Sequence, residues 1–246
     1  MSDTGDMKLK IMHLYPDLLN LYGDRGNIEC MKRRLIWRGI GCEVVSHTCD
    51  DSGFDISDTD ILFLGGGSDR EQKIVCSRLL EHKEAISEFA ENGGTIVAVC
   101  GGYQLLGRYY RLEDETIEGL GILDIYTEQG EGRLIGNIVL ESDIAGYIVG
   151  FENHGGRTHI GSHEPLGRVV FGHGNDESSG AEGVVYKNVI ATYLHGPLLP
   201  KNPRLCDRIL KNALEHKYGE SVELAALDDA LEEKANSYIV QRFVKK

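Results

Sequence analysis

The sequence predicts an α/β fold with a mostly parallel central sheet, a β-rich second half and C-terminal helices. In the first half, short β-branched and apolar runs alternate with helical patterns, which is typical of a parallel sheet. In the second half, several short strand candidates are separated by glycines. The chain of 246 residues is long enough to bury a large core. We expect a single domain over residues 1–246, with its core at about residues 8–218 and a helical extension at 219–246.

Composition and charge argue against several classes of function. The 39 acidic and 26 basic residues give a formal net charge of −13, which argues against a nucleic-acid groove and against electrostatic attachment to an anionic membrane. No apolar run has the length of a membrane-spanning helix, and residues 1–6 are polar and acidic, unlike a signal peptide. The six cysteines form no C-x-x-C pair and no cluster with histidine, so we expect reduced thiols and no bound metal. A cytoplasmic protein without membrane insertion is therefore expected.

The first elements follow the order of a parallel sheet. Strand candidates occupy residues 9–14, 42–46 and 61–64. Between the first two, residues 27–38 carry apolar side chains at helical spacing among basic ones, and Gly39 follows as a helix stop. Strand, helix, strand, loop and strand is the succession that a parallel α/β sheet requires.

A glycine loop, Gly65-Gly66-Gly67, follows the third strand candidate. We expect a helix from Asp69 to about residue 91, with Asp69 as its cap and Gln72 three residues further on. The loop lacks the spacing of a phosphate-binding G-x-x-x-x-G-K-[ST] or G-x-G-x-x-G motif, so a nucleotide site is not favoured. Two interpretations stay open: a tight turn only, or a loop whose Gly66 and Gly67 amides stabilise an oxyanion.

A strand candidate at residues 95–99 stops at Cys100, and two glycines follow. This is the pattern of a strand-to-helix elbow, in which the side chain stands at the carboxyl end of a parallel strand above a helix N-terminus. We expect Cys100 to face open solvent and this helix dipole, which together lower the thiol pKa from its usual value of about 8.5. The N–H of Gly101 is then placed to donate to an oxyanion. The alternative is a buried cysteine that merely ends a core strand.

A histidine ends another apolar strand candidate. Residues 189–194 lead to His195, Gly196 and Pro197, so the imidazole is expected at a strand tip, where ligands bind in open α/β sheets. A thiol and an imidazole at two strand ends are the minimum for nucleophilic acyl chemistry, because the imidazole takes the proton that the thiol loses. The other elements expected are a short helix at 104–108, strands at 135–141, 148–151 and 168–171, and helices at 203–217 and 222–243.

Two of these segments resemble a known family. Residues 98–104, Ala-Val-Cys-Gly-Gly-Tyr-Gln, resemble the C-x-G-x-Q nucleophile elbow of class I glutamine amidotransferases, and residues 64–67, Leu-Gly-Gly-Gly, resemble their oxyanion loop. The resemblance implies the three-layer fold of those enzymes. It also implies that Cys100 and His195 are catalytic and that Gln104 contributes to substrate binding.

The chain departs from most of that family after the histidine. Most members have a glutamate two residues after it, which completes a catalytic triad, whereas this chain has Pro197. The departure is shared by the cobyric-acid-synthase-like branch of the family. It leaves open which group orients His195, and Glu152 or a main-chain carbonyl is a candidate.

Longer blocks resemble a family within that branch, the amidotransferase subunits of lipid II isoglutaminyl synthases. The blocks are residues 19–27, 65–72, 119–124, 150–158 and 192–197. The resemblance implies a subunit that hydrolyses L-glutamine and passes ammonia to a Mur-ligase-like partner in a heterodimer. The partner is expected to hold ATP and magnesium and to amidate the D-glutamate of lipid II during peptidoglycan synthesis, with no cofactor on this chain. An arginine that holds glutamine in that family points to Arg133 here.

Three alternatives stay open. The same chemistry could serve another carboxylate acceptor such as a corrinoid, although a corrinoid synthetase is expected to carry its ATP-dependent domain on the same chain, and this chain has no P-loop. The chain could be a non-catalytic binding subunit, which the missing glutamate after His195 favours and the intact Cys100 opposes. It could also be a stand-alone cysteine hydrolase, which would release ammonia without a partner.

Overall fold

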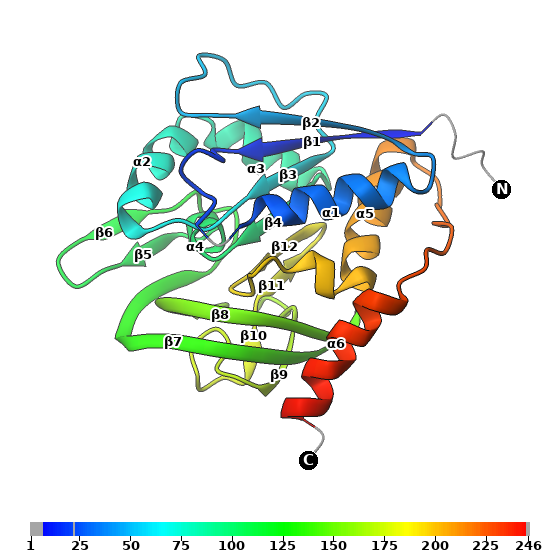
Figure 1. Ribbon diagram of the computed structural model, residues 1–246. Helices are drawn as coiled ribbons and strands as arrows, with labels where there is room; N and C mark the ends of the chain where they lie inside the picture. The colour runs from blue at the N-terminus through cyan, green and yellow to red at the C-terminus, as the bar shows by residue number, and fades with distance from the viewer. Residues whose placement is uncertain (1–6, 22, 245–246) are drawn as a thin grey trace.

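The computed structural model describes residues 7–21 and 23–244, which form two β-sheets with helices around them (Figure 1). The first sheet has six strands in the order β11-β12-β4-β3-β1-β2. Its neighbours pair in parallel except at the β11–β12 edge, so the expected parallel central sheet is confirmed. The strands are β1 (Lys8–Leu14), β2 (Gly41–His47), β3 (Ile61–Leu64), β4 (Thr95–Val99), β11 (Val184–Tyr186) and β12 (Val189–Thr192).

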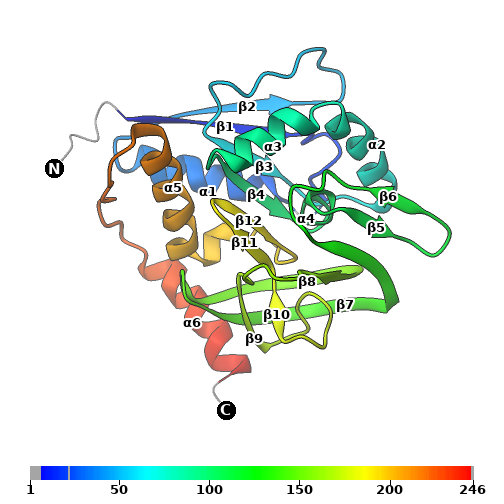
Figure 2. The same ribbon diagram turned by 180° about the vertical axis from the view of Figure 1, so that it is seen from behind.

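Helices cover both faces of this sheet, with α1 in front of the strands in Figure 1 and α3 in front of them in Figure 2. Right-handed crossovers explain the two layers, because the chain moves one way along the sheet through α1 and the other way through α2 and α3. Across the described residues, no helix combines the length and the apolar character needed to cross a bilayer. The helices are α1 (Arg25–Ile36), α2 (Asp69–Leu80), α3 (Lys83–Glu91), α4 (Gly101–Leu106), α5 (Pro203–Tyr218), α6 (Ala230–Phe243) and the 3₁₀ helix η2 (Leu199–Lys201).

The helix expected over residues 69–91 is two helices. His82 interrupts it with the non-helical dihedrals φ −116° and ψ 11°, and its ring stacks on Phe54 at 4.1 Å. This ring contact with a distant loop gives a physical reason for the break. The first of the two helices is also capped one residue earlier than expected, by Ser68 in a capping box with Glu71.

The C-terminal helix α6 begins at Ala230 and not at residue 222 as expected. The segment before it is anchored to the core by Arg34, a side chain of α1 that is 2% exposed. Its guanidinium pairs with Asp207 of α5 at 2.7 Å and with Asp229, the residue before α6, at 2.5 Å. A buried guanidinium needs carboxylate partners, and these two ion pairs link the start of α6 to α1 and α5.

Residues 109–182 form a mostly antiparallel sheet of their own, in the order β10-β9-β7-β5-β6 with β8 paired to β7. β7 and β8 form a long hairpin that runs beneath the parallel sheet in Figure 1. They are longer than the expected strands at 135–141 and 148–151, because an irregular section between Gln129 and Leu134 is accommodated inside β7 as a bulge. The strands are β5 (Tyr109–Arg111), β6 (Thr116–Glu118), β7 (Tyr126–Ser142), β8 (Gly146–His159), β9 (Gly167–Phe171) and β10 (Ala181–Glu182).

Three strands of the parallel sheet end side by side. Thr192 of β12 pairs with Val99 of β4, and Leu64 of β3 pairs with Ala98 of β4. Every residue of these strands is buried, so the loops that follow them start from a rigid core. The glycine loop, the cysteine and the histidine singled out in the sequence therefore meet at one edge of the sheet.

Candidate active site

Cys100 occupies a strained elbow between β4 and α4. Its backbone has φ 51° and ψ −107°, a combination that residues with a Cβ rarely adopt. Neighbours hold this geometry: Cys100 N–H donates to Thr192 O at 2.8 Å, and Gly102 N–H donates to Gly65 O at 3.0 Å. A Cβ on Gly102 would lie 2.7 Å from Leu64 Cβ, so glycine is required there. The elbow expected from the sequence is thus present, with α4 beginning directly after the cysteine.

The Cys100 thiol is buried, so the expectation of an open thiol with a lowered pKa is wrong. The residue is only 6% exposed. Burial raises the pKa of the thiol to about 12, and the charge of Asp24 acts in the same direction. The neighbouring Gly101 N–H and the charge of Arg133 lower the pKa by less. The group is therefore a neutral thiol here, and it needs a base to become a thiolate.

His195 supplies an imidazole that is neutral at ordinary pH. The residue follows β12 and is 2% exposed. Its backbone pairs with Phe151 of β8 in both directions, at 3.0 and 3.2 Å, so the second sheet holds the histidine in place. Burial lowers the pKa of His195 to about 4, and the neighbouring charges of His154 and Lys201 act the same way. A neutral imidazole can accept the proton that a thiol must lose.

The three N–H groups expected to bind an oxyanion differ in their hydrogen bonding in the structure. The Gly101 N–H lies next to the Cys100 sulfur, where it lowers the pKa of the thiol, and Gly67 N–H has no hydrogen-bond partner among the described residues. Gly66 N–H donates instead to Asp24 Oδ2 at 2.9 Å. Gly66 is therefore not available to an oxyanion in this structure, because a carboxylate already occupies its amide. Gly67 and Gly101 remain as candidate donors.

A cavity of about 340 Å³ opens over the thiol. It is lined mainly by polar groups from the glycine loop, from α4 and from the β7–β8 hairpin. Residues 7–21 and 23–244 contain no group of three or more histidine, cysteine, aspartate and glutamate side chains that could hold a metal ion. Of the site residues expected from the sequence, Cys100, Gly67, Gln104 and Arg133 line the cavity, whereas Gly66, Gly101 and His195 do not.

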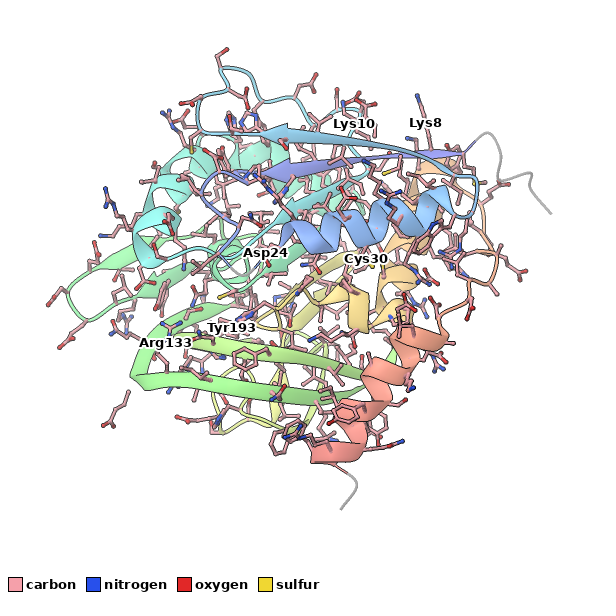
Figure 3. All side chains as sticks on the ribbon, in the orientation of Figure 1. Lys8, Lys10, Asp24, Cys30, Arg133 and Tyr193 are labelled. Atoms are coloured by element: carbon pink, nitrogen blue, oxygen red, sulfur yellow. The ribbon has the colours of Figure 1, made fainter. Side chains whose placement is uncertain are left out.

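Arg133 presents a guanidinium at the wall of this cavity, near the bend of β7 (Figure 3). Its Nε donates to Asn153 Oδ1 and its Nη2 to Asn153 O, both at 2.8 Å. These two bonds fix the plane of the guanidinium, and Nη1 has no hydrogen bond within the described part of the chain. A guanidinium held in one orientation with a spare donor suits a carboxylate ligand.

Gln104 belongs to a buried hydrogen-bond chain next to the cavity. Its Nε2 donates to the Tyr193 hydroxyl at 3.1 Å, and that hydroxyl lies 2.5 Å from Thr158 Oγ1. His154 stacks on the Tyr193 ring with the centroids 3.6 Å apart. These contacts join α4, β8 and the segment that leads to His195, so they hold the surroundings of both catalytic candidates together.

Glu152, a candidate to orient His195, is completely buried. Its carboxylate accepts from His173 N–H at 2.8 Å and from Gly174 N–H at 2.9 Å, and its Oε2 lies 3.9 Å from His154 Nε2. Its charge raises the pKa of His195, against the larger effect of burial. The group that orients His195 stays a prediction, with Glu152 as a near neighbour.

Sequence reasoning missed the roles of Asp24, Gln72 and His154. Asp24 follows β1, whose carboxyl end lies at the same sheet edge as the site, and this position is the signal that could have found it. Gln72 was expected only as part of a helix cap, yet it lines the cavity and donates from Nε2 to Gly67 O at 3.2 Å. His154 also lines the cavity. Its signal in the sequence was its place in residues 150–158, one of the blocks that resemble the amidotransferase family.

Sequence comparison identifies the family of the chain. Residues 10–203 match the CobB/CobQ-like glutamine amidotransferase domain, a stretch of well over half the chain. The chain belongs to this family.

Two relatives of this amidotransferase match nearly its whole length. It is 45% identical over 238 residues to the Staphylococcus aureus protein named lipid II isoglutaminyl synthase (glutamine-hydrolyzing) subunit GatD, with 96% of each chain covered. It is 42% identical over 233 residues to the Streptococcus pneumoniae protein of the same name, with 92% of this chain and 88% of that protein covered. A cobyric acid synthase from Listeria innocua is 29% identical over 202 residues, which cover 72% of this chain and 39% of that protein.

Solved structures share the fold of this amidotransferase. PurLQS from Thermotoga maritima gives a TM-score of 0.57 at 18% identity and covers 87% of this chain and 100% of that chain. A structure described as a glutamine amidotransferase gives 0.56 at 18% identity, with 82% and 98% covered. The expected class I amidotransferase-like fold is confirmed.

Proposed function

We propose that this amidotransferase is the glutaminase subunit of a two-subunit enzyme that amidates the D-glutamate of lipid II. It hydrolyses L-glutamine to glutamate and ammonia, and a Mur-ligase-like partner uses ATP and magnesium to attach the ammonia. The catalytic half rests on one observation: the Cys100 thiol lies beneath an arginine-lined cavity at the sheet edge that also carries His195. The acceptor half is supported by the two near-full-length relatives, which are named as subunits of lipid II isoglutaminyl synthase.

The proposed reaction starts from a neutral thiol and a neutral imidazole. His195 accepts the proton of Cys100 as the sulfur attacks the side-chain carbonyl carbon of glutamine. The N–H groups of Gly101 and Gly67 hold the oxyanion. The carbon–nitrogen bond then breaks, His195 returns its proton to the leaving nitrogen, and ammonia departs from a γ-glutamyl thioester. Water gives a proton to His195 and its hydroxide to the acyl carbon, which releases glutamate, and the proton restores the thiol.

Transfer of labelled nitrogen tests the whole proposal. The chain is co-expressed with its Mur-ligase-like partner and supplied with amide-¹⁵N glutamine, ATP, magnesium and lipid II that carries D-glutamate in its stem peptide. We expect ¹⁵N in the new D-isoglutamine amide only when both subunits are present. Full ammonia release without the partner would favour a stand-alone hydrolase, and no release in any mixture would favour a binding subunit. Transfer of ¹⁵N to a corrinoid carboxylate, and not to lipid II, would favour an amidotransferase that serves a corrinoid acceptor.

Replacing Arg133 by alanine should weaken glutamine binding more than it slows turnover. Arg133 is proposed to hold the α-carboxylate, an interaction made in the ground state and the transition state alike. We expect KM for glutamine to rise about 10- to 100-fold and kcat to change by less than about 3-fold. Arg111→Ala is the matched control, because Arg111 is an exposed arginine of β5 that pairs with Glu128 outside this cavity. An unchanged KM in Arg133→Ala would remove the assigned role.

A further inference from the structure

We propose that Asp24 is a positioning residue for glutamine hydrolysis: it holds the glycine loop, Gly65-Gly66-Gly67, so that Gly67 keeps its N–H open at the cavity. This inference rests on the proposed function, because it concerns how the oxyanion of that reaction is bound. Asp24 is completely buried and lies at the beginning of α1 (Figure 3). It does not line the cavity, so it acts through the loop and not on substrate.

The backbone of the glycine loop is held from both sides. The groups that hold it come from the β1–α1 connection, from α2 and from the helix that follows the nucleophile, so the loop is fixed relative to Cys100. A Cβ on Gly65 would lie 2.2 Å from Leu19 O, which shows how closely the β1–α1 connection packs against the loop. The four contacts are Gly102 N–H to Gly65 O at 3.0 Å, Gly66 N–H to Asp24 Oδ2 at 2.9 Å, Leu21 N–H to Gly66 O at 3.0 Å and Gln72 Nε2 to Gly67 O at 3.2 Å.

The side chain of Asp24 does not cap the helix that it precedes. An aspartate at an N-cap normally accepts from the first N–H groups of the helix that it caps. Asp24 occupies the N-cap of α1 without any such side-chain bond, and its Oδ2 accepts instead from Gly66, 42 positions along the chain. Its Oδ1 is buried with no hydrogen-bond partner in the described structure. A buried carboxylate oxygen without a hydrogen-bond partner destabilises the fold, and such an arrangement is typical of a functional site.

Removing the carboxylate should have two separable effects. Without its acceptor, Gly66 N–H becomes a buried donor with no partner, and the glycine backbone is free to rotate and carry Gly67 N–H out of place. The second effect is electrostatic: the charge of Asp24 raises the pKa of the Cys100 thiol, so its loss makes the thiolate easier to form. Turnover of glutamine should fall, whereas the intrinsic reactivity of the sulfur should not.

The experiment compares Asp24→Ala and Asp24→Asn in the complex with the partner. Asparagine keeps an oxygen that accepts from Gly66 and removes the charge, so it is the conservative variant. We expect Asp24→Ala to lower kcat for glutamine about 10- to 100-fold with KM within about 3-fold, and Asp24→Asn to stay within about 5-fold of wild type. Alkylation of Cys100 by iodoacetamide needs no oxyanion hole, and its rate should equal or exceed that of wild type in both variants.

Asp17→Ala serves as the control, because Asp17 is an exposed aspartate of the same connection. Equal loss of kcat in Asp24→Ala and Asp24→Asn would overturn the proposal, since the retained acceptor would then not matter. Alkylation that falls in parallel with turnover would also overturn it, because the whole site would have collapsed. If the wild-type complex is active and Asp24→Ala has the same kcat, the positioning role of Asp24 is rejected and the proposed function is not. A wild-type complex without Cys100-dependent hydrolysis would instead reject the proposed function, and this inference with it.

Discussion

Replacing Cys100 by alanine should abolish glutamine hydrolysis, with kcat lowered at least about 10⁴-fold, because alanine cannot form the thioester. Cys100→Ser should be similarly inactive. Burial already raises the pKa of the thiol to about 12, and the same surroundings penalise an alkoxide, whose hydroxyl is a much weaker acid. The measurement is glutamate and ammonia release by the complex with the partner subunit.

Two controls separate chemistry from folding in that experiment. Cys42→Ser changes a thiol on β2, which ends the strand order on the side away from β4 and β12, and should keep full activity. The melting temperature and the association with the partner should be retained by Cys100→Ala, because the elbow is held by backbone bonds from Thr192 and Gly65. Hydrolysis by Cys100→Ala above about 1% of wild type would show that another nucleophile performs the reaction.

Replacing His195 by asparagine should lower kcat for glutamine by about 10³-fold. The thiol and the imidazole both rest in their neutral forms, so the proton must move between them as the sulfur attacks. Asparagine cannot accept it, although its size allows the backbone pairing with Phe151 to persist. Stopped-time assays of glutamate release measure the loss. His216→Asn, an exposed histidine of α5, is the matched control and should remain fully active.

The pH dependence of kcat/KM tests the same role. His195 accepts a proton only when it is neutral, and its pKa is lowered to about 4. Activity should therefore persist down to about pH 5 and fall near pH 4, whereas an ordinary histidine with a pKa of about 6.5 would lose activity earlier. An acid limb centred near pH 6.5 in a folded protein would contradict the assignment.

Stability must be followed at each pH in that series. Unfolded histidine binds a proton below about pH 6.5, whereas folded His195 does so only near pH 4. On account of His195 the unfolded state thus binds more protons between these values, and the contribution of this residue to the free energy of unfolding decreases as the pH falls through the window. Buried His13, whose pKa is also lowered to about 4, adds to the same trend. Circular dichroism distinguishes acid unfolding from protonation of the base.

The sequence by itself determined the parallel half of the fold and the position of the elbow. Both depend on local signals: apolar runs that end in glycine, and Cys100 followed by two glycines at the end of one such run. Because parallel strands end at a common edge, these local signals also place His195 and the glycine loop near Cys100. The family resemblance in the same segments adds the expectation of glutamine chemistry.

Only the tertiary structure decided the state of these groups. His195 pairs with Phe151 of the second sheet, and the burial of Cys100 reverses the expected direction of the thiol pKa shift. The Gly66 amide is occupied by Asp24, a residue 42 positions away in the chain, which no spacing rule could reveal. In the same way, ring stacking on Phe54 accompanies the helix break at His82. Desolvation and long-range hydrogen bonds arise only when distant segments pack together, and for this reason they could not be predicted from the sequence.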